Sequence, residues 1–201
     1  MANNEIDNVG AQHLIKVLKG KNQLSEIDID NNKISGSVLT DLFNILPLRN
    51  LNLMKNVLED EQVAPISKTL TTNLAIQQIF MSHNKMSQEA MAMFASGLEA
   101  NSRLTDLFFT HNDLQEAGEA GLAFIKSLSN KKELRSLALN SCNLNGQYLE
   151  ALQEAVQGHR ELRELYLFAN KIESEEGRSI AAILKGKTKL TCLGLSNNKL
   201  G

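Results

Sequence analysis

The stretch that decides the fold is LRELYLFANKI, which runs from Leu162 to Ile172. Its first, fourth, sixth and eleventh positions are large and apolar, and its ninth position is asparagine. With Ile, Met or Phe accepted in place of Leu, and Cys once in place of Asn, the pattern occurs six more times. The other copies are LSEIDIDNNKI (24–34), LRNLNLMKNVL (48–58), IQQIFMSHNKM (76–86), LTDLFFTHNDL (104–114), LRSLALNSCNL (134–144) and LTCLGLSNNKL (190–200). Seven copies in one chain indicate a repeat protein.

The ninth position gives the period of the repeat. A truncated copy, NEI at positions 4–6, opens the chain. The ninth-position residues are therefore Asn4, Asn32, Asn56, Asn84, Asn112, Cys142, Asn170 and Asn198, separated by 28, 24, 28, 28, 30, 28 and 28 residues. The short interval ends at Pro47, and the long interval carries two extra residues near Gly118 and Gly121.

A helical pattern lies between successive motifs. Apolar residues recur four positions apart there, which places both side chains on one face of a helix. The pairs are Leu14/Leu18, Leu42/Leu46, Ile66/Leu70, Phe94/Leu98, Phe124/Leu128, Leu152/Val156 and Ile180/Leu184. Four residues before a motif stand Gly20, Asn130, Gly158 and Gly186. These residue types predict the left-handed position that ends a helix.

Each motif therefore predicts one short strand, followed by a turn and a helix. One repeat cannot bury its own leucines, so stacked repeats must share a continuous core between parallel strands and helices. We expect the ninth-position residue to turn inward where the strand ends, so that its side chain satisfies backbone groups of the turn. Cys142 is a weaker hydrogen-bonding partner than asparagine but fits the same place.

These motifs resemble the leucine-rich repeat family, and within it the ribonuclease-inhibitor-like subclass. A period near 28, Asn or Cys at the ninth position and a full helix in each repeat carry the resemblance. It implies an α/β solenoid shaped as a horseshoe arc, with a parallel sheet on the concave face and α-helices on the convex face. It covers residues 1–201 as one domain of about seven repeats.

Neither end of the chain shows a polar capping segment, although solenoids usually need one. We therefore expect both ends to be open. The first interpretation is a fragment of a longer protein. The alternative is monomers that associate end to end through their strand edges.

Composition narrows the classes of function. Lys and Arg total 21 against 23 for Asp and Glu, which gives a formal charge of −2 and no broad cationic field for nucleic acid. Two cysteines cannot form a disulfide framework, which favours a reducing, cytoplasmic location. The start of the chain lacks the pattern of a signal peptide, and no stretch approaches the length of a membrane span. We expect neither nucleic acid nor a membrane as a partner.

No catalytic motif stands out, so we expect no enzyme, no cofactor and no metal. Gly186-Lys187-Thr188 resembles the end of a phosphate-binding loop, but it leads from a helix into a strand, which is the wrong order. His83 and His111 occupy the same column near Asp106, yet two ligands on a flat sheet make a poor metal site. Cys142 and Cys192 face different ways, so we expect no disulfide.

The variable strand positions indicate a binding surface, because alternate side chains of each strand face the concave side. Four of the nine aromatic residues of the chain fall there, namely Phe80, Phe108, Tyr166 and Phe168. We interpret them as anchors for a partner. The alternative is that they pack on one another and stiffen the sheet. The predicted polar surroundings are His83, His111, Asp106, Arg135 and Arg163.

The resemblance implies a protein–protein interaction scaffold that binds a partner protein through its concave face. The acidic first repeat, with Glu26, Asp28 and Asp30, could orient a basic partner. One alternative is a GTPase-activating regulator resembling the Ran GTPase activator, although the acidic tail of that family is missing after Gly201. A second alternative is a structural subunit of a cytoskeletal or ciliary assembly, which docks through its convex helices.

Overall fold

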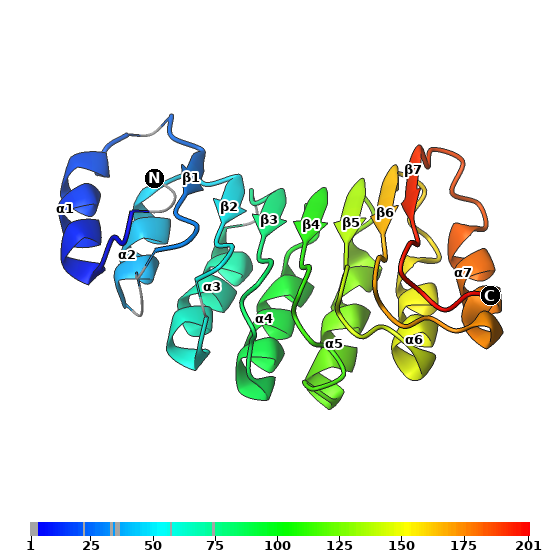
Figure 1. The fold of residues 1–201 in the computed structure, drawn as a ribbon. Helices are drawn as coiled ribbons and strands as arrows, with labels where there is room; N and C mark the ends of the chain where they lie inside the picture. The colour runs from blue at the N-terminus through cyan, green and yellow to red at the C-terminus, as the bar shows by residue number, and fades with distance from the viewer. Residues whose placement is uncertain (1–3, 22, 33, 35–36, 57, 74) are drawn as a thin grey trace.

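Strand, turn and helix alternate along the chain in the computed structural model (Figure 1). The structure describes residues 4–21, 23–32, 34, 37–56, 58–73 and 75–201. Within them the strands are β1 (Glu26–Asp28), β2 (Asn50–Asn52), β3 (Gln78–Phe80), β4 (Asp106–Phe108), β5 (Ser136–Ala138), β6 (Glu164–Tyr166) and β7 (Cys192–Gly194). The α-helices are α1 (Asn8–Leu18), α2 (Ser37–Ile45), α3 (Asp60–Thr72), α4 (Gln88–Ala100), α5 (Glu119–Ser127), α6 (Gly146–Val156) and α7 (Gly177–Leu184). The 3₁₀-helices are η1 (Leu128–Asn130) and η2 (Ser174–Glu176).

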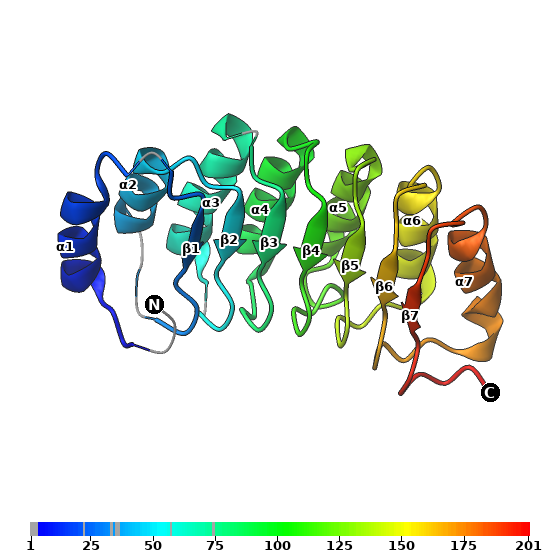
Figure 2. The ribbon, with the colours of Figure 1, turned by 90° about the horizontal axis from the view of Figure 1, so that it is seen from above.

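The strands form one parallel sheet in the order β1 to β7, which confirms the predicted α/β leucine-rich-repeat solenoid. Each strand pairs with the next so that equal motif positions lie side by side, as Phe80 and Phe108 do. Each motif position therefore forms a straight column across the sheet. Figure 2 shows the strands along the inner side of a shallow arc and the helices along its outer side.

The core lies between the sheet and the helices. In the five central repeats, both members of every predicted helical pair are buried, for example Phe94 with Leu98. Leu14 and Leu18 of α1 and Leu184 of α7 are half-buried, because they lie in the first and last described repeats. Phe94, Phe109 and Phe124 form a three-ring cluster in this core, with centroids 4.2 to 6.0 Å apart.

Unequal repeat lengths are absorbed on the helical side. In the short repeat, α2 has 9 residues where α3 has 13. In the long repeat, a turn ending at Gly118, with φ of 55°, precedes α5. A Cβ at Gly121 would lie 2.1 Å from the Leu114 carbonyl oxygen, so only glycine lets α5 pack this closely on that loop.

The predicted asparagine ladder is present. The Asn84 Oδ1 atom accepts the backbone N–H of Asn56 at 2.9 Å, and its Nδ2 atom donates to the Leu53 and Met81 carbonyls at 3.0 and 2.7 Å. Each asparagine thus joins its own turn to the turn of the preceding repeat. The same pattern holds at Asn56, Asn112, Asn170 and Asn198. Asn32 accepts the Ile6 N–H at 3.0 Å and donates to the Ile29 carbonyl of its own turn at 3.0 Å.

Cys142 is the weak rung of this ladder. Its Sγ atom donates to the Phe109 and Asn140 carbonyls at 3.3 and 3.4 Å, in place of the amide donor of the other repeats. A thiol carries no carbonyl oxygen, so it cannot accept the Asn112 N–H in the way that Asn112 accepts from Asn84. Burial raises the pKa of Cys142 to about 12, so the sulfur stays a neutral thiol.

A second column of polar side chains lies where the helices return to the strands. We call it the loop column; its members stand three residues before the motifs of their repeats, at Asn73, Asn101, Lys131, His159 and Lys187. Asn73 and Asn101 each donate to the carbonyl of the first residue of the preceding motif, at 3.1 Å. The other three, Lys131, His159 and Lys187, donate to carbonyls at the ends of α4, α5 and α6, at 2.6, 3.0 and 3.2 Å. The two polar columns therefore tie successive repeats together at opposite edges of the sheet.

The helix ends were predicted correctly at two of four positions. Gly20 and Gly186 have φ values of 88° and 78°, as a left-handed C′ residue requires. The prediction is wrong for Asn130, which lies in η1 and donates to the Glu99 carbonyl at 2.7 Å. It is also wrong for Gly158, which does not have a positive φ; a Cβ there would lie 3.0 Å from the Lys132 Nζ atom.

Two substitutions test the energetic weight of the ladder. We expect Asn84→Ala to lower the free energy of unfolding by at least about 2 kcal/mol, because it leaves two carbonyls and one N–H without their partner. We expect Cys142→Asn to raise it by roughly 1 kcal/mol, because it restores an acceptor at the weak rung. Urea unfolding followed by circular dichroism measures both. A destabilised Cys142→Asn variant would show that the site has room only for a thiol.

His159 makes stability depend on pH. Its Nε2–H donates to the Leu128 carbonyl, while its buried Nδ1 atom has no partner among the described residues. Burial lowers the pKa of His159 to about 4, with Lys132, Lys187 and Lys131 adding to the effect. Between about pH 6.5 and pH 4 the unfolded chain binds a proton that the folded chain does not, so stability falls as the pH falls through this window.

The matched control is His159→Asn, because asparagine occupies the same column at Asn73 and Asn101, where it also donates to a backbone carbonyl of another repeat. We expect the wild type to lose about 2 kcal/mol more than this variant between pH 7 and pH 5. Urea unfolding at the two pH values measures the difference. Identical losses would contradict the role of His159.

Candidate functional site

The concave face is built from the third, fifth and seventh motif positions, which alternate with the buried leucines along each strand. The fifth position is the last residue of every strand and reads Asp28, Asn52, Phe80, Phe108, Ala138, Tyr166 and Gly194. Because the sheet is in register, these side chains form one straight column. We call it the central column.

Phe80 and Phe108 stand upright in the central column. Their rings stack with centroids 4.8 Å apart and planes 3° from parallel. This separation matches the spacing of about 4.8 Å between neighbouring strands. Both side chains are half-buried, so the rings pack on each other and still present apolar surface. Binding and sheet stiffening, the two interpretations of these residues, are thus compatible.

Tyr166 and Phe168 form a second aromatic pair on β6 and just beyond it. Their ring centroids are 5.8 Å apart. The Phe168 ring covers Gly194, where a Cβ would lie 2.3 Å from the ring carbon Cζ. A hydrogen bond with the Cys192 side chain, followed by burial and the nearby Glu164 carboxylate, raises the pKa of Tyr166 to about 12. The phenol therefore stays protonated at neutral pH.

The two aromatic pairs border a shallow hollow of about 440 Å³ on the concave face. Phe80 and Phe108 lie on one side of it and Tyr166 and Phe168 on the other. Between them stands Ala138, which is only 3% exposed. The structure thus brings all four predicted aromatic anchors to one surface.

The concave face is acidic and lacks cations. Its 21 positions hold five carboxylates, at Glu26, Asp28, Asp30, Asp106 and Glu164, and neither lysine nor arginine. Neutral donors hold these groups: Gln78 and Thr105 donate to Asp106 at 3.0 and 2.7 Å, and Ser136 donates to Glu164 at 3.0 Å. In the described part of the chain, none of the five lies within ion-pairing distance of a lysine or arginine.

The other predicted site residues lie at the two edges of this face. His83 and His111 follow their strands at the carboxyl edge, where a positive φ of 63° and 60° turns the backbone. Arg135 and Arg163 immediately precede β5 and β6, so they lie at the opposite edge and are exposed. The structure therefore groups Asp106 with the aromatic residues and separates the histidines from the arginines.

The two histidines stack on each other. Their ring centroids are 4.2 Å apart, and both side chains are exposed. Partial desolvation of the stacked ring lowers the pKa of His83, with the nearby His111 and Lys55 adding to the effect. The described residues contain no group of three or more His, Cys, Asp or Glu side chains arranged to hold a metal ion.

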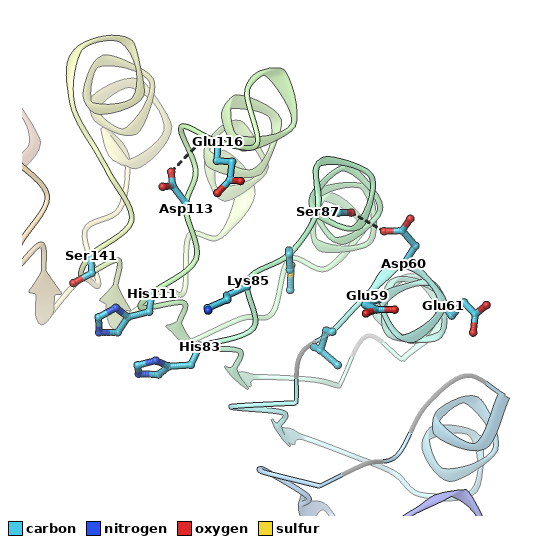
Figure 3. Close-up of a pocket in the computed structure, with 12 residues that line it drawn as sticks. Glu59, Asp60, Glu61, His83, Lys85, Ser87, His111, Asp113, Glu116 and Ser141 are labelled. Carbon is cyan, nitrogen blue, oxygen red and sulfur yellow. Dashed lines mark hydrogen bonds between the residues drawn. The ribbon is translucent and has the colours of Figure 1, made fainter.

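A larger groove of about 1000 Å³ runs along the carboxyl edge (Figure 3). Figure 3 shows His83 and His111 beside Lys85 on one side, with acidic residues at the beginning of α3 and in the turn before α5. The carboxylates are those of Glu59, Asp60, Glu61, Asp113 and Glu116. Several serve the chain itself, since Asp60 accepts from the Ser87 hydroxyl at 2.6 Å and Asp113 accepts from the Glu116 N–H at 3.0 Å. Acidic groups at helix N-termini also stabilise the helices.

The cysteines agree with the sequence prediction. Cys142 and Cys192 are both free thiols, the first buried in the ladder and the second half-buried on the concave face.

Among the described residues, no helix has the length and apolar character needed to cross a bilayer.

Comparisons with known proteins support the fold. The sequence matches no family model and no curated protein sequence. The structure is similar to a solved structure described as Leiomodin-1 actin-binding site 2 (ABS2), with a TM-score of 0.54 and 13% sequence identity. The match covers 88% of this chain and 87% of that chain. At this level of identity the likeness shows a shared fold over most of the chain.

Three features escaped the sequence analysis. The loop column could have been found by aligning the residues before each motif, where Asn73, Asn101, Lys131, His159 and Lys187 are all polar donors. The absence of lysine and arginine from the concave face could also have been found, by comparing the third, fifth and seventh positions of all the motifs. The carboxyl-edge groove could not have been found in this way, because it depends on the distance between the helices and the turns.

His111 should influence the protonation of its neighbour. We expect His83 to titrate below pH 6.5, the usual value for histidine, and its pKa to rise in a His111→Asn variant, because a positive neighbour is removed. The rise is partial, since some desolvation of the ring remains. NMR titration of the imidazole protons measures it. An unchanged pKa of His83 would contradict the electrostatic coupling of the pair.

Proposed function

We propose that this protein is a non-enzymatic scaffold that binds a partner protein on its concave face. The observation that carries the proposal is the pair of aromatic clusters, Phe80 with Phe108 and Tyr166 with Phe168, around one hollow. The core does not need these rings on this side of the sheet. Rigid, half-exposed aromatic residues are frequent anchors of protein interfaces.

The fold favours binding because the surface is organised before the partner arrives. Every strand is fixed to its neighbours by backbone bonds and by the asparagine ladder, so little backbone freedom remains to be lost on binding. The excess of carboxylates favours a partner with a basic surface and disfavours an acidic one.

Actin is a second candidate partner. The chain shares its fold with a structure described as an actin-binding site, and a cytoskeletal role was among the alternatives raised by the sequence. The same comparison adds nothing for a GTPase-activating role.

Within the fold, the period near 28 residues and the full helices support the ribonuclease-inhibitor-like subclass. The two free thiols support a reducing, cytoplasmic location.

Random peptides and filamentous actin serve as probes of the concave face. We expect phage-displayed 12-residue peptides selected on the wild type to bind the double variant Phe80→Ala with Phe108→Ala at least tenfold more weakly in calorimetry. This loss corresponds to about 1.4 kcal/mol or more, a usual effect for an aromatic anchor. The melting temperature should change little, because neither ring belongs to the core.

Glu150→Ala is the control, because this exposed residue lies on α6, away from the sheet. It should leave peptide binding unchanged. Equal affinity of the double variant and the wild type, for the peptides and for any actin that co-sediments with the wild type, would remove the aromatic residues from the binding site.

A further inference from the structure

The central column has a gap of one ring. Register places Phe108, Ala138 and Tyr166 side by side on β4, β5 and β6. The flanking positions are therefore two strand spacings apart, about 10 Å. The Phe80–Phe108 stack shows that this column accommodates one upright ring for every strand, at 4.8 Å. Ala138 supplies only a methyl group, and the hollow of about 440 Å³ lies against it, lined also by Phe108 and Tyr166.

The ends of the gap are chemically distinct. At one end lies Glu164, whose Oε2 atom accepts from the buried Ser136 hydroxyl at 3.0 Å. At the other end lies Asn140, whose Oδ1 atom accepts the Phe168 N–H at 2.8 Å and whose Nδ2 atom donates to the Thr110 hydroxyl at 3.3 Å. The amide of Asn140 is thus already engaged, whereas Glu164 is held by a neutral donor and has no cationic partner among the described residues.

A planar cation matches these features. Its faces would stack on aromatic rings, and its edge would donate hydrogen bonds to a carboxylate. The guanidinium group of arginine combines both properties, whereas an ammonium group has no flat face and an apolar side chain leaves the carboxylate without a counter-charge. The lack of any cation in the 21 concave positions means that the chain itself does not provide this group.

We propose that the gap over Ala138 binds an arginine side chain of the partner protein, stacked between Phe108 and Tyr166 and paired with Glu164. This inference rests on the proposed function, since it names the chemistry that the concave face recognises.

The smallest probe is N-acetyl-L-arginine methylamide, titrated into the protein and followed by NMR. We expect saturable shifts of the Ala138 methyl group and of the Phe108 and Tyr166 ring protons. The citrulline analogue has the same shape but no charge, and the lysine analogue has the charge but no plane; both should bind at least fivefold more weakly. Equal binding of either analogue would overturn the assignment of a guanidinium site.

Two substitutions address the gap itself. Ala138→Phe places a ring of the chain in the gap, as Phe108 already stands beside Phe80, and should abolish the shifts without lowering the melting temperature. Glu164→Gln keeps the size of the side chain and should weaken arginine binding at least fivefold, while binding of the citrulline analogue stays as it was. Unchanged arginine binding in both variants would refute the site.

Selected peptides separate this inference from the proposed function. Peptides that lose affinity in the Phe80→Ala, Phe108→Ala variant but bind Ala138→Phe as well as the wild type would uphold the scaffold and overturn the arginine site. Support for the site would come from peptides that lose at least tenfold in affinity in two cases. One is the exchange of their arginine for citrulline, and the other is the replacement of the wild type by Ala138→Phe. A selection that yields no arginine at all would also overturn it.

Discussion

The bond between a ninth-position amide and the turn of the preceding repeat is the constraint on which the rest of the structure depends. A turn that leaves a parallel strand has backbone groups that no strand neighbour can reach, and their burial without partners is costly. Asn84 satisfies three such groups from two repeats at once. It thereby fixes the offset between repeats as well as the turn. Columns of equal motif positions follow from this fixed offset, and a continuous binding surface follows from the columns.

Much of the fold was readable from the sequence, because the repeat reports the same physical problem seven times. The apolar residue at the position of Leu107 is buried in six of the seven copies, all but Leu193 of the last repeat, so its spacing alone identifies the strand. Gly158 and Asn130 were misread, because a helix can end in several ways and the choice depends on neighbouring side chains such as Lys132. The aromatic residues could be assigned to the concave face, yet their stacking and the gap over Ala138 required the register of three adjacent strands.

Electrostatics divides the molecule into surfaces of different character. The concave face concentrates carboxylates that are held by neutral donors, whereas buried lysines of the loop column complement the carboxyl ends of helices, as Lys131 does by donating to the Leu98 and Ser127 carbonyls. Burial lowers the pKa of Lys131 to about 8, and the nearby Glu99 carboxylate opposes this effect, so most of the ammonium groups stay charged at neutral pH. Buried lysines therefore hold successive repeats together, whereas the carboxylates of the concave face remain available to a partner.

The thiol at Cys142 also makes the junction between two repeats weaker than its neighbours. In a linear array each unit is stabilised only by its neighbours, so cooperative opening begins at the weakest junction. The run of amide rungs that ends at Asn112 is separated by this thiol from the run that resumes at Asn170. The hollow between Phe108 and Tyr166 spans the same junction. A ligand bound in this hollow would contact the repeats on both sides of the weak junction. Binding on the concave face would therefore slow hydrogen exchange on both sides of that junction.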